Sequence, residues 1–98
     1  MPYMASILIY AEWYSALMST NYRKLLLMKL LEHGYIGGRH TAIENLAKGF
    51  PKHDRGSIAK VVKELIKDGL IVPKPTSYGL HVSLNAARMR EIEENLKQ

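Results

Sequence analysis

The spacing of the apolar residues changes near Gly69, and this change restricts the folds that the chain can adopt. Before Gly69 the apolar residues recur every three or four positions, which predicts an amphipathic helix over Asp54–Asp68 with Asp54 as its N-cap. After Gly69, Leu70–Val72 is a short apolar run, and apolar and polar residues alternate over Leu80–Leu84. Both segments are typical of short strands. A helix followed by a two-stranded hairpin indicates an α+β domain that is mostly helical.

Further segments before, between and after these predicted elements complete the predicted fold. A leucine-rich helix is expected over residues 22–33, ended by Gly34. Thr41–Glu44 has the spacing of a capping box, which predicts the start of a short helix. Turn-forming residues over 73–79 predict the loop at the tip of the hairpin. A final helix is expected to be capped near Asn85.

The first 19 residues are predicted to form a separate N-terminal helix, and residues 20–98 to form the main domain. Aromatic and aliphatic residues with helical spacing give this first segment one large contact surface. The residues of this surface are Tyr3, Ile7, Tyr10, Trp13, Tyr14 and Leu17. Two interpretations stay open, because the helix could pack on the core of its own chain or form the interface of a homodimer.

The same N-terminal segment lacks the pattern of a membrane span or a secretory signal. Glu12 lies at its centre, and serine, threonine and tyrosine dilute its apolar residues. It also has no positive n-region and no small-residue cleavage site. We therefore expect a cytoplasmic protein without a membrane partner.

The positive charge of the chain is concentrated in its middle. The whole sequence has a formal net charge of +5. Residues 23–67 contain ten Lys or Arg against four Asp or Glu, whereas residues 1–22 have a net charge of −1 and residues 68–98 a net charge of zero. A local positive field of this kind favours a polyanion or an acidic surface as partner. The alternative is a solvated helix face with surplus lysine.

Motifs for catalysis or metal binding are lacking in the sequence. It has no cysteine, which excludes disulfides, thiolate metal sites and cysteine nucleophiles. The histidines His33, His40, His53 and His81 fall in separate predicted elements without the spacing of a metal site. The sequence has no nucleotide-binding glycine motif, nucleophile elbow or catalytic carboxylate pair. We therefore expect no enzymatic activity, no cofactor and no metal.

The order of the predicted elements resembles that of the winged helix-turn-helix domains of small prokaryotic and archaeal transcription regulators. The resemblance covers roughly residues 22–96 and is carried by Thr41–Ala47, Val61–Ile71 and Leu80–Asn85. Where many of these regulators have Thr and then Gly-Arg, this chain has Asn-Ala-Ala-Arg over Asn85–Arg88. The resemblance implies a winged helix-turn-helix with an extra N-terminal helix. It also implies a protein that recognises sequence in double-stranded DNA and regulates transcription.

The predicted basic helix carries its lysines opposite its apolar side. At about 100° per residue, Lys60, Lys63 and Lys67 fall within about 40° of the point opposite the apolar face. Gly56 leaves the backbone open to a phosphate or a base near the helix start. Arg55 lies nearer the apolar side, so a structural ion pair competes with a DNA contact there.

The resemblance assigns the DNA contacts to the turn, the second helix of the motif and the hairpin loop, or wing. Arg55, Ser57 and Lys60 would face base edges, and Lys63 and Lys67 would face phosphates or solvent. The complete set of candidate residues is Lys52, His53, Arg55, Gly56, Ser57, Lys60, Lys63, Lys67, Lys74, Thr76, Ser77 and Tyr78. A plain hairpin tip is the alternative for the wing.

Two other functions are compatible with this sequence. A winged helix can serve as a protein–protein contact module in a larger nucleic-acid-associated complex, because fold does not fix function. RNA binding is a third option, but the sequence shows no aromatic stacking platform outside its first segment.

Overall fold

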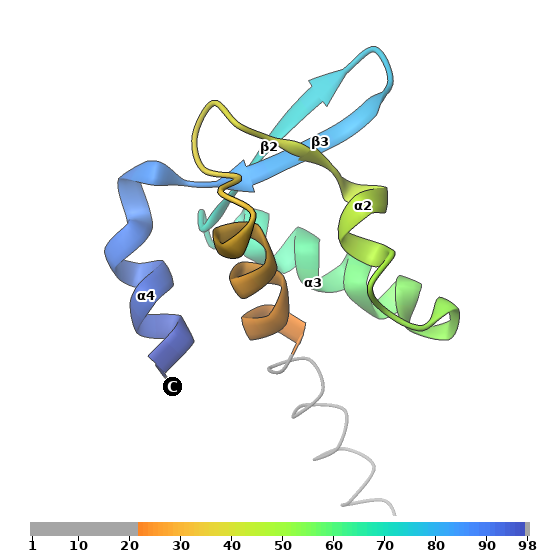
Figure 1. The fold of residues 1–98 in the computed structure, drawn as a ribbon, viewed down its shortest axis with the longest axis horizontal. Helices are drawn as coiled ribbons and strands as arrows, with labels where there is room; N and C mark the ends of the chain where they lie inside the picture. Colours follow the sequence, from red (N-terminus) through yellow and green to blue (C-terminus); the bar gives the residue numbers. More distant parts are fainter. Residues whose placement is uncertain (1–21, 98) are drawn as a thin grey trace, which may run out of the picture.

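The computed structural model describes residues 22–97, which form helices and a three-stranded antiparallel sheet (Figure 1). Residues 22–32 are helical. The elements that follow are β1 (Thr41–Ala42), α2 (Ile43–Ala47), a 3-10 turn (Lys52–Asp54), α3 (Arg55–Lys67), β2 (Ile71–Thr76), β3 (Gly79–Leu84), a second 3-10 turn (Ala86–Arg88) and α4 (Met89–Lys97). This confirms the α+β class that the sequence predicts.

The strands lie in the order β1-β3-β2, so β3 is the central strand of the sheet. β2 and β3 form an antiparallel hairpin and pair along their whole length. On the other side of β3, Thr41 of β1 lies opposite Val82. Residues 35–37 continue this side, because Leu84 N donates to the Tyr35 carbonyl at 2.8 Å and Gly37 N donates to the Leu84 carbonyl at 3.0 Å. β3 is therefore bonded on both sides.

The hairpin has a shorter loop than the one that its sequence predicts over 73–79. β2 continues to Thr76, and only Ser77 and Tyr78 form the turn. Pro73 and Pro75 favour a loop in sequence reasoning because proline has no N–H to donate. They fit in β2 because β2 is an edge strand, and no other strand between residues 22 and 97 bonds its outer side.

Two predicted helix caps lack the expected side-chain hydrogen bonds. The capping box over Thr41–Glu44 does not form, because Thr41 is only 4% exposed and pairs within the sheet. Its Oγ1 accepts a hydrogen bond from Asn45 Nδ2 at 3.2 Å instead. Asp54 is the N-cap residue of α3, as predicted, but its side chain makes no cap hydrogen bond. The 3-10 turn before α3 leads into the helix directly, and Arg55 N donates to the Lys52 carbonyl.

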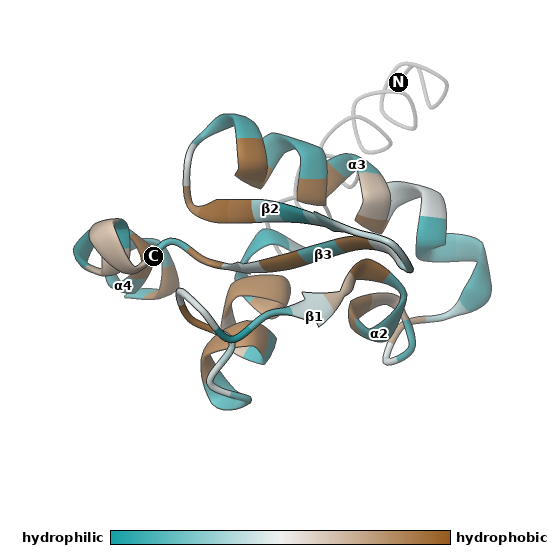
Figure 2. Cartoon of the chain, turned by 90° about the horizontal axis from the view of Figure 1, so that it is seen from above, coloured by the Kyte–Doolittle hydropathy of each residue, from teal (hydrophilic) through white to brown (hydrophobic). Residues whose placement is uncertain are grey.

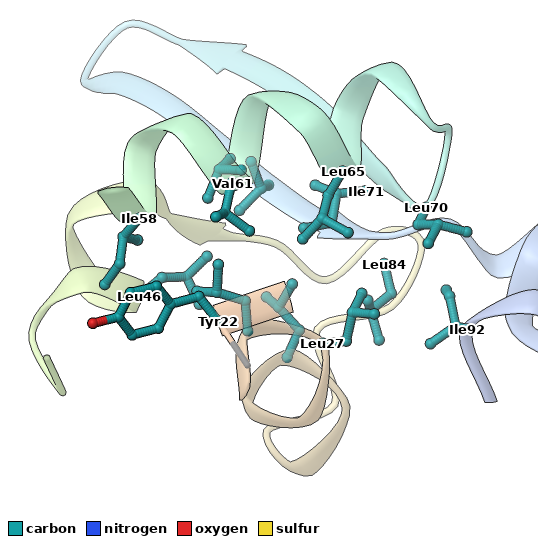
Figure 3. Close-up of a cluster of buried hydrophobic side chains, with 14 residues drawn as sticks. Tyr22, Leu27, Leu46, Ile58, Val61, Leu65, Leu70, Ile71, Leu84 and Ile92 are labelled. Atoms are coloured by element: carbon teal, nitrogen blue, oxygen red, sulfur yellow. The ribbon is translucent and has the colours of Figure 1, made fainter. Parts of the chain in front are cut away.

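The described residues share a hydrophobic core, which lies between the sheet and the helices (Figure 3). Its members come from residues 22–32, α2, α3, residues 70–71, β3 and α4. The side chains that are at most 2% exposed are Leu26, Leu27, Leu30, Leu46, Ile58, Val61, Val62, Leu65, Ile71, Val82, Leu84 and Ile92. The apolar face predicted for α3 is thus buried, apart from the half-buried Ile66.

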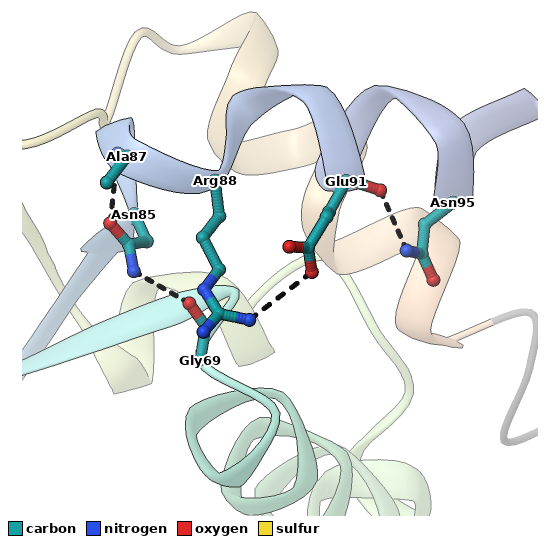
Figure 4. A network of polar contacts seen from close by, with 6 residues as sticks. All are labelled: Gly69, Asn85, Ala87, Arg88, Glu91 and Asn95. Carbon is teal, nitrogen blue, oxygen red and sulfur yellow. Dashed lines mark hydrogen bonds and ion pairs between the residues drawn. The ribbon is translucent and has the colours of Figure 1, made fainter.

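The last helix is fixed to the turn after α3 by a small polar network (Figure 4). Asn85 Nδ2 donates to the Gly69 carbonyl at 2.8 Å, and Asn85 Oδ1 accepts from Ala87 N at 3.0 Å. The second contact confirms the cap predicted near Asn85. Gly69 has a φ of +81°, and a Cβ at this position would lie 3.4 Å from the guanidinium carbon of Arg88. The positive φ therefore favours glycine at this turn, whereas the distance to Arg88 is an ordinary contact.

The colouring by hydropathy separates the outer turns of α3, which are hydrophilic, from its side toward the sheet (Figure 2). The helix over 22–32 differs, because it keeps two large apolar residues at the surface. Leu25 is 46% exposed and Met28 is 43% exposed. The helix predicted over 1–19, with its candidate interface from Tyr3 to Leu17, lies outside the described residues. Among the helices that the structure describes, none has the length and apolar character needed to cross a membrane.

Candidate functional site

The outer face of α3 is a basic surface formed by Lys60, Lys63 and Lys67, which we call the lysine face. All three side chains are exposed, as the helical spacing predicts. None of them forms an ion pair with another residue of the described range 22–97. Glu64 is the single acidic residue within α3. The three positive charges are therefore available to a partner.

The start of α3 adds further exposed polar groups to the lysine face. Lys52 and His53 belong to the 3-10 turn, and Arg55 and Ser57 belong to the first turn of α3. All four are exposed. His53 Nε2 lies 3.6 Å from Asp54 Oδ1. Arg55 takes part in no ion pair between described residues, so the structural alternative proposed for it from its helical angle is not found.

Gly56 has no steric partner inside the described part of the protein. A Cβ added there would meet no atom within 4 Å, and the residue does not have a positive φ. Glycine in a helix costs about 0.5–1 kcal/mol relative to alanine. Folding alone gives no reason for glycine at this position, whereas a ligand that approaches the backbone closely would give one.

The hairpin tip holds an aromatic side chain at the surface on a well-defined turn. Tyr78 is 95% exposed. Thr76 Oγ1 accepts from Tyr78 N at 3.1 Å and donates to the Gly79 carbonyl at 2.8 Å. Gly79 has a φ of +129°, which favours glycine. Ser77 and Tyr78 are thus the residues of this tip that remain open to a partner.

Lys74, predicted as a DNA contact of the wing, lies with two histidines that sequence reasoning left apart. His81 pairs with Lys74 in the hairpin, and His40 Nδ1 lies 2.8 Å from His81 Nδ1. The pKa of His40 is lowered by partial burial of the ring, then by the positive charge of Lys74, and then by His81. His40 and His81 are 41 positions apart, so only the pairing of β1 with β3 could have revealed the contact.

A pocket of about 200 Å³ lies beside the helix over 22–32. Its lining residues are Lys29, His33, Tyr35, Thr41, Asn45 and Leu46. The ammonium group of Lys29 donates to the carbonyls of Leu46 at 3.1 Å and Asn45 at 3.4 Å, and it lies 5.7 Å from the centre of the Phe50 ring. Lys29 therefore holds the end of α2, which is a structural role.

The candidate residues thus fall into two exposed groups. The first comprises the lysine face with the start of α3, and the second comprises the hairpin tip. α3 contacts β2, the strand that leads to the tip. Comparisons of the chain with protein-family models, with curated proteins and with solved structures found no match. The geometry of these two groups is therefore the basis for a function.

Proposed function

We propose that this protein binds double-stranded DNA through the outer face of α3, as a sequence-reading regulator of transcription. The observation that carries the proposal is the lysine face, with three exposed lysines and no ion pair among the described residues. Unpaired surface lysines of this kind favour a polyanion, because contact with phosphates releases condensed counterions. Duplex DNA is the polyanion that a helix face of this width fits, since its major groove admits an α-helix.

The order of the elements supports a winged helix-turn-helix arrangement. A helix, the short strand β1, α2, α3 and the hairpin of β2 and β3 follow one another in the order expected of such a domain. In this arrangement α3 would be the recognition helix and the hairpin would be the wing. The buried side of α3 is fixed by Ile58, Val62 and Leu65, so its outer side is presented in one orientation.

The proposed contacts divide by chemistry. Lys63, Lys67 and the turn residue Lys52 would neutralise phosphates and set the register of α3 on the duplex. Arg55 and Lys60, with Ser57, would reach base edges, and the guanidinium of Arg55 matches guanine O6 and N7. Gly56 would let a phosphate approach the backbone.

The wing would add a second set of contacts. Tyr78 and Ser77 at the tip, supported by Thr76, would meet the neighbouring groove or backbone. Lys74 would add a positive charge farther down the hairpin. His53, next to Lys52, would contact the backbone of the DNA.

A salt titration of duplex binding tests the proposal. The wild-type protein should bind with an affinity that falls steeply as salt rises, with a slope of about −0.9 per phosphate contacted. Lys63→Ala should weaken binding by roughly tenfold at about 0.1 M salt, because one phosphate is no longer neutralised. Lys60→Ala should weaken binding by about 1–3 kcal/mol, because a base contact is lost. Arg90→Ala and Lys97→Ala on α4 are matched controls, because they remove exposed positive charges outside the lysine face. The absence of binding at low salt would overturn the proposal, and so would equal decreases in affinity for both pairs of variants.

Specificity and assembly need their own measurements. A sequence-reading protein should enrich a common site from a pool of random duplexes, whereas binding to phosphates alone would enrich none.

A homodimer formed through residues 1–19 should become a monomer when residues 1–18 are deleted, as followed by sedimentation at several concentrations. A monomer before and after the deletion would end the dimer proposal.

A protein-contact module is the second candidate function. The observation that favours it is the exposed pair Leu25 and Met28 on the helix over 22–32. Exposed large apolar residues on one helix face are typical of an interface. If this candidate is correct, the protein should not bind duplex DNA at low salt. The double substitution Leu25→Ser with Met28→Ser should abolish binding of the protein partner. Lys60→Ala and Lys63→Ala should leave binding of that partner unchanged.

A further inference from the structure

His40 and His81 hold two imidazole nitrogens side by side on the sheet. Their Nδ1 atoms are 2.8 Å apart, their ring centres are 4.9 Å apart, and the ring planes meet at 68°. Both side chains are half-buried, so neither ring is immersed in the core. An Nδ1–Nδ1 hydrogen bond needs one nitrogen with a proton and one with a free lone pair. In this contact one Nδ1 therefore donates its proton and the other accepts it.

The backbone fixes this pair. His81 lies in the central strand β3, opposite Ala42 of β1 and Lys74 of β2. His40 immediately precedes β1 in the chain. The backbone therefore holds both residues close together, but hydrogen-bonded Nδ1 atoms point at each other, so each ring would turn by roughly 45° to face one ion. The fixed backbone reduces the ordering cost of binding.

We propose that His40 and His81 form a two-imidazole site for a divalent transition-metal ion of the Cu²⁺ or Ni²⁺ type. The ion would take the place of the proton on the donor Nδ1, and the donor ring would carry its proton on Nε2 instead, so that both rings coordinate as neutral imidazoles. Imidazole nitrogen suits copper, nickel and zinc, whereas magnesium and calcium prefer oxygen. The inference does not depend on DNA binding.

The distance between the nitrogens favours ions with ligands at right angles. With metal–nitrogen bonds of about 2.0–2.1 Å, nitrogens 2.8 Å apart subtend about 85–90° at the metal. This angle matches adjacent positions of a square-planar or octahedral ion. A tetrahedral zinc ion would need the nitrogens to move apart to roughly 3.4 Å.

The surroundings determine how strongly the site binds. Within the described residues no third histidine, aspartate or glutamate completes a metal-ligand group. Water or an added ligand would therefore fill the other positions. Lys74 lies across the hairpin from His81, and its charge acts against a cation.

A copper titration at pH 7.5 tests the site in the full chain. One equivalent of Cu²⁺ should bind, and pulsed electron paramagnetic resonance should show two equatorial imidazole nitrogens. His40→Ala and His81→Ala should each leave at most one imidazole and weaken binding by roughly tenfold, since the second ring binds intramolecularly. His81→Gln repeats the test with a side chain that retains hydrogen-bonding groups. His33→Ala and His53→Ala are the controls, because these histidines are exposed and lie elsewhere.

Each outcome decides the proposal. Loss of the two-imidazole signal in the His40 and His81 variants, with the controls unchanged, would support it. A single-imidazole signal in the wild-type protein would overturn it, and so would equal affinity in all variants or no binding at millimolar Cu²⁺. Circular dichroism of each variant separates loss of the site from loss of the fold. Lys74→Ala should strengthen binding, because it removes the nearby positive charge.

Discussion

α3 and α4 are both amphipathic helices on the same core, but they present different charges to solvent. α3 buries Ile58, Val61, Val62 and Leu65, whereas α4 fully buries only Ile92. The exposed side of α3 carries Arg55 and three lysines against one glutamate. The exposed charges of α4 are of both signs and comprise Arg90, Glu91, Glu93, Glu94 and Lys97.

The comparison of α3 with α4 separates two features of a helix sequence, which are its amphipathic spacing and the sign of its exposed charges. Amphipathic spacing predicts a polar outer side for both helices, so polarity alone indicates only burial of the other side. The nearly uniform sign of the charges on α3 is the additional observation. A mixed-sign surface such as that of α4 is typical of a solvated helix. Substitutions on and around the two helices can test whether they differ in this way.

The largest change in the free energy of unfolding should come from a substitution on the buried side of α3. Leu65 is fully buried at the centre of the core, so Leu65→Ala should lower the free energy of unfolding by about 2–5 kcal/mol. The exposed substitution Lys67→Ala on the same helix should change it by no more than about 0.5 kcal/mol. Urea denaturation of both variants measures the difference. Similar decreases in the two would contradict the assignment of separate buried and binding sides.

The second effect concerns the attachment of α4. Asn85→Ala removes the hydrogen bond to the Gly69 carbonyl and the cap on Ala87 N. We expect a decrease of about 1–3 kcal/mol in the free energy of unfolding, because two backbone groups are left without their partners. Duplex affinity should stay unchanged in the folded protein, since Asn85 lies outside the lysine face. Thermal unfolding and a binding titration check the two statements, with Asn95→Ala in α4 as control.

Gly56→Ala should move stability and binding in opposite directions. Alanine fits the open space at this position and should raise the free energy of unfolding by about 0.5–1 kcal/mol. If the backbone of α3 meets a phosphate there, the added methyl group should weaken DNA binding. Gly38→Ala is the control, because its Cβ would also meet nothing within 4 Å. A more stable protein with unchanged affinity would remove Gly56 from the contact set.

A smaller effect should appear in the pH dependence of stability. Neither α3 nor α4 contains a histidine, whereas the pKa of His40 is lowered by partial burial, by Lys74 and by His81. The unfolded chain then binds more protons than the folded chain below about pH 6.5. The contribution of His40 to the free energy of unfolding should be complete above about pH 6.5. It should be lost as the pH falls through the lower pKa of His40 in the folded protein. Urea denaturation of the wild type and His40→Asn between pH 5 and 8, with a chelator present, measures it. Identical pH profiles would contradict the assignment.

The sequence predicts much of this fold because its local patterns agree with the tertiary packing. The helix over 54–68 and its apolar face are recovered almost residue for residue, since the buried stripe follows the helical period. β1 is beyond local reasoning, because two residues become a strand only by pairing with β3. The loop predicted over 73–79 is too long for a related reason, because the prolines of β2 are expected in a loop and lie in a strand. Their tolerance depends on the edge position of the strand.

The features of the candidate site also divide into those that the sequence predicts and those that depend on the tertiary structure. The lysine face is predictable, because three positions on one helix are related by geometry within the chain. The contact between His40 and His81 depends on the sheet register and has no local signal. Gly56 lies between these cases. Its position is evident in the sequence, but the lack of any packing reason for glycine is evident only from the structure.

The two prolines of β2 have a consequence for how this molecule meets others. An open strand edge is a template for further strands and so for aggregation. Pro73 and Pro75 remove donors from the outer edge of β2, and on the opposite side β1 is only two residues long. In the part of the chain that the structure describes, the sheet therefore has two poor borders for the addition of a further strand. Concentrated solutions of this protein should resist fibril formation, and Pro73→Val with Pro75→Val would restore a continuous edge.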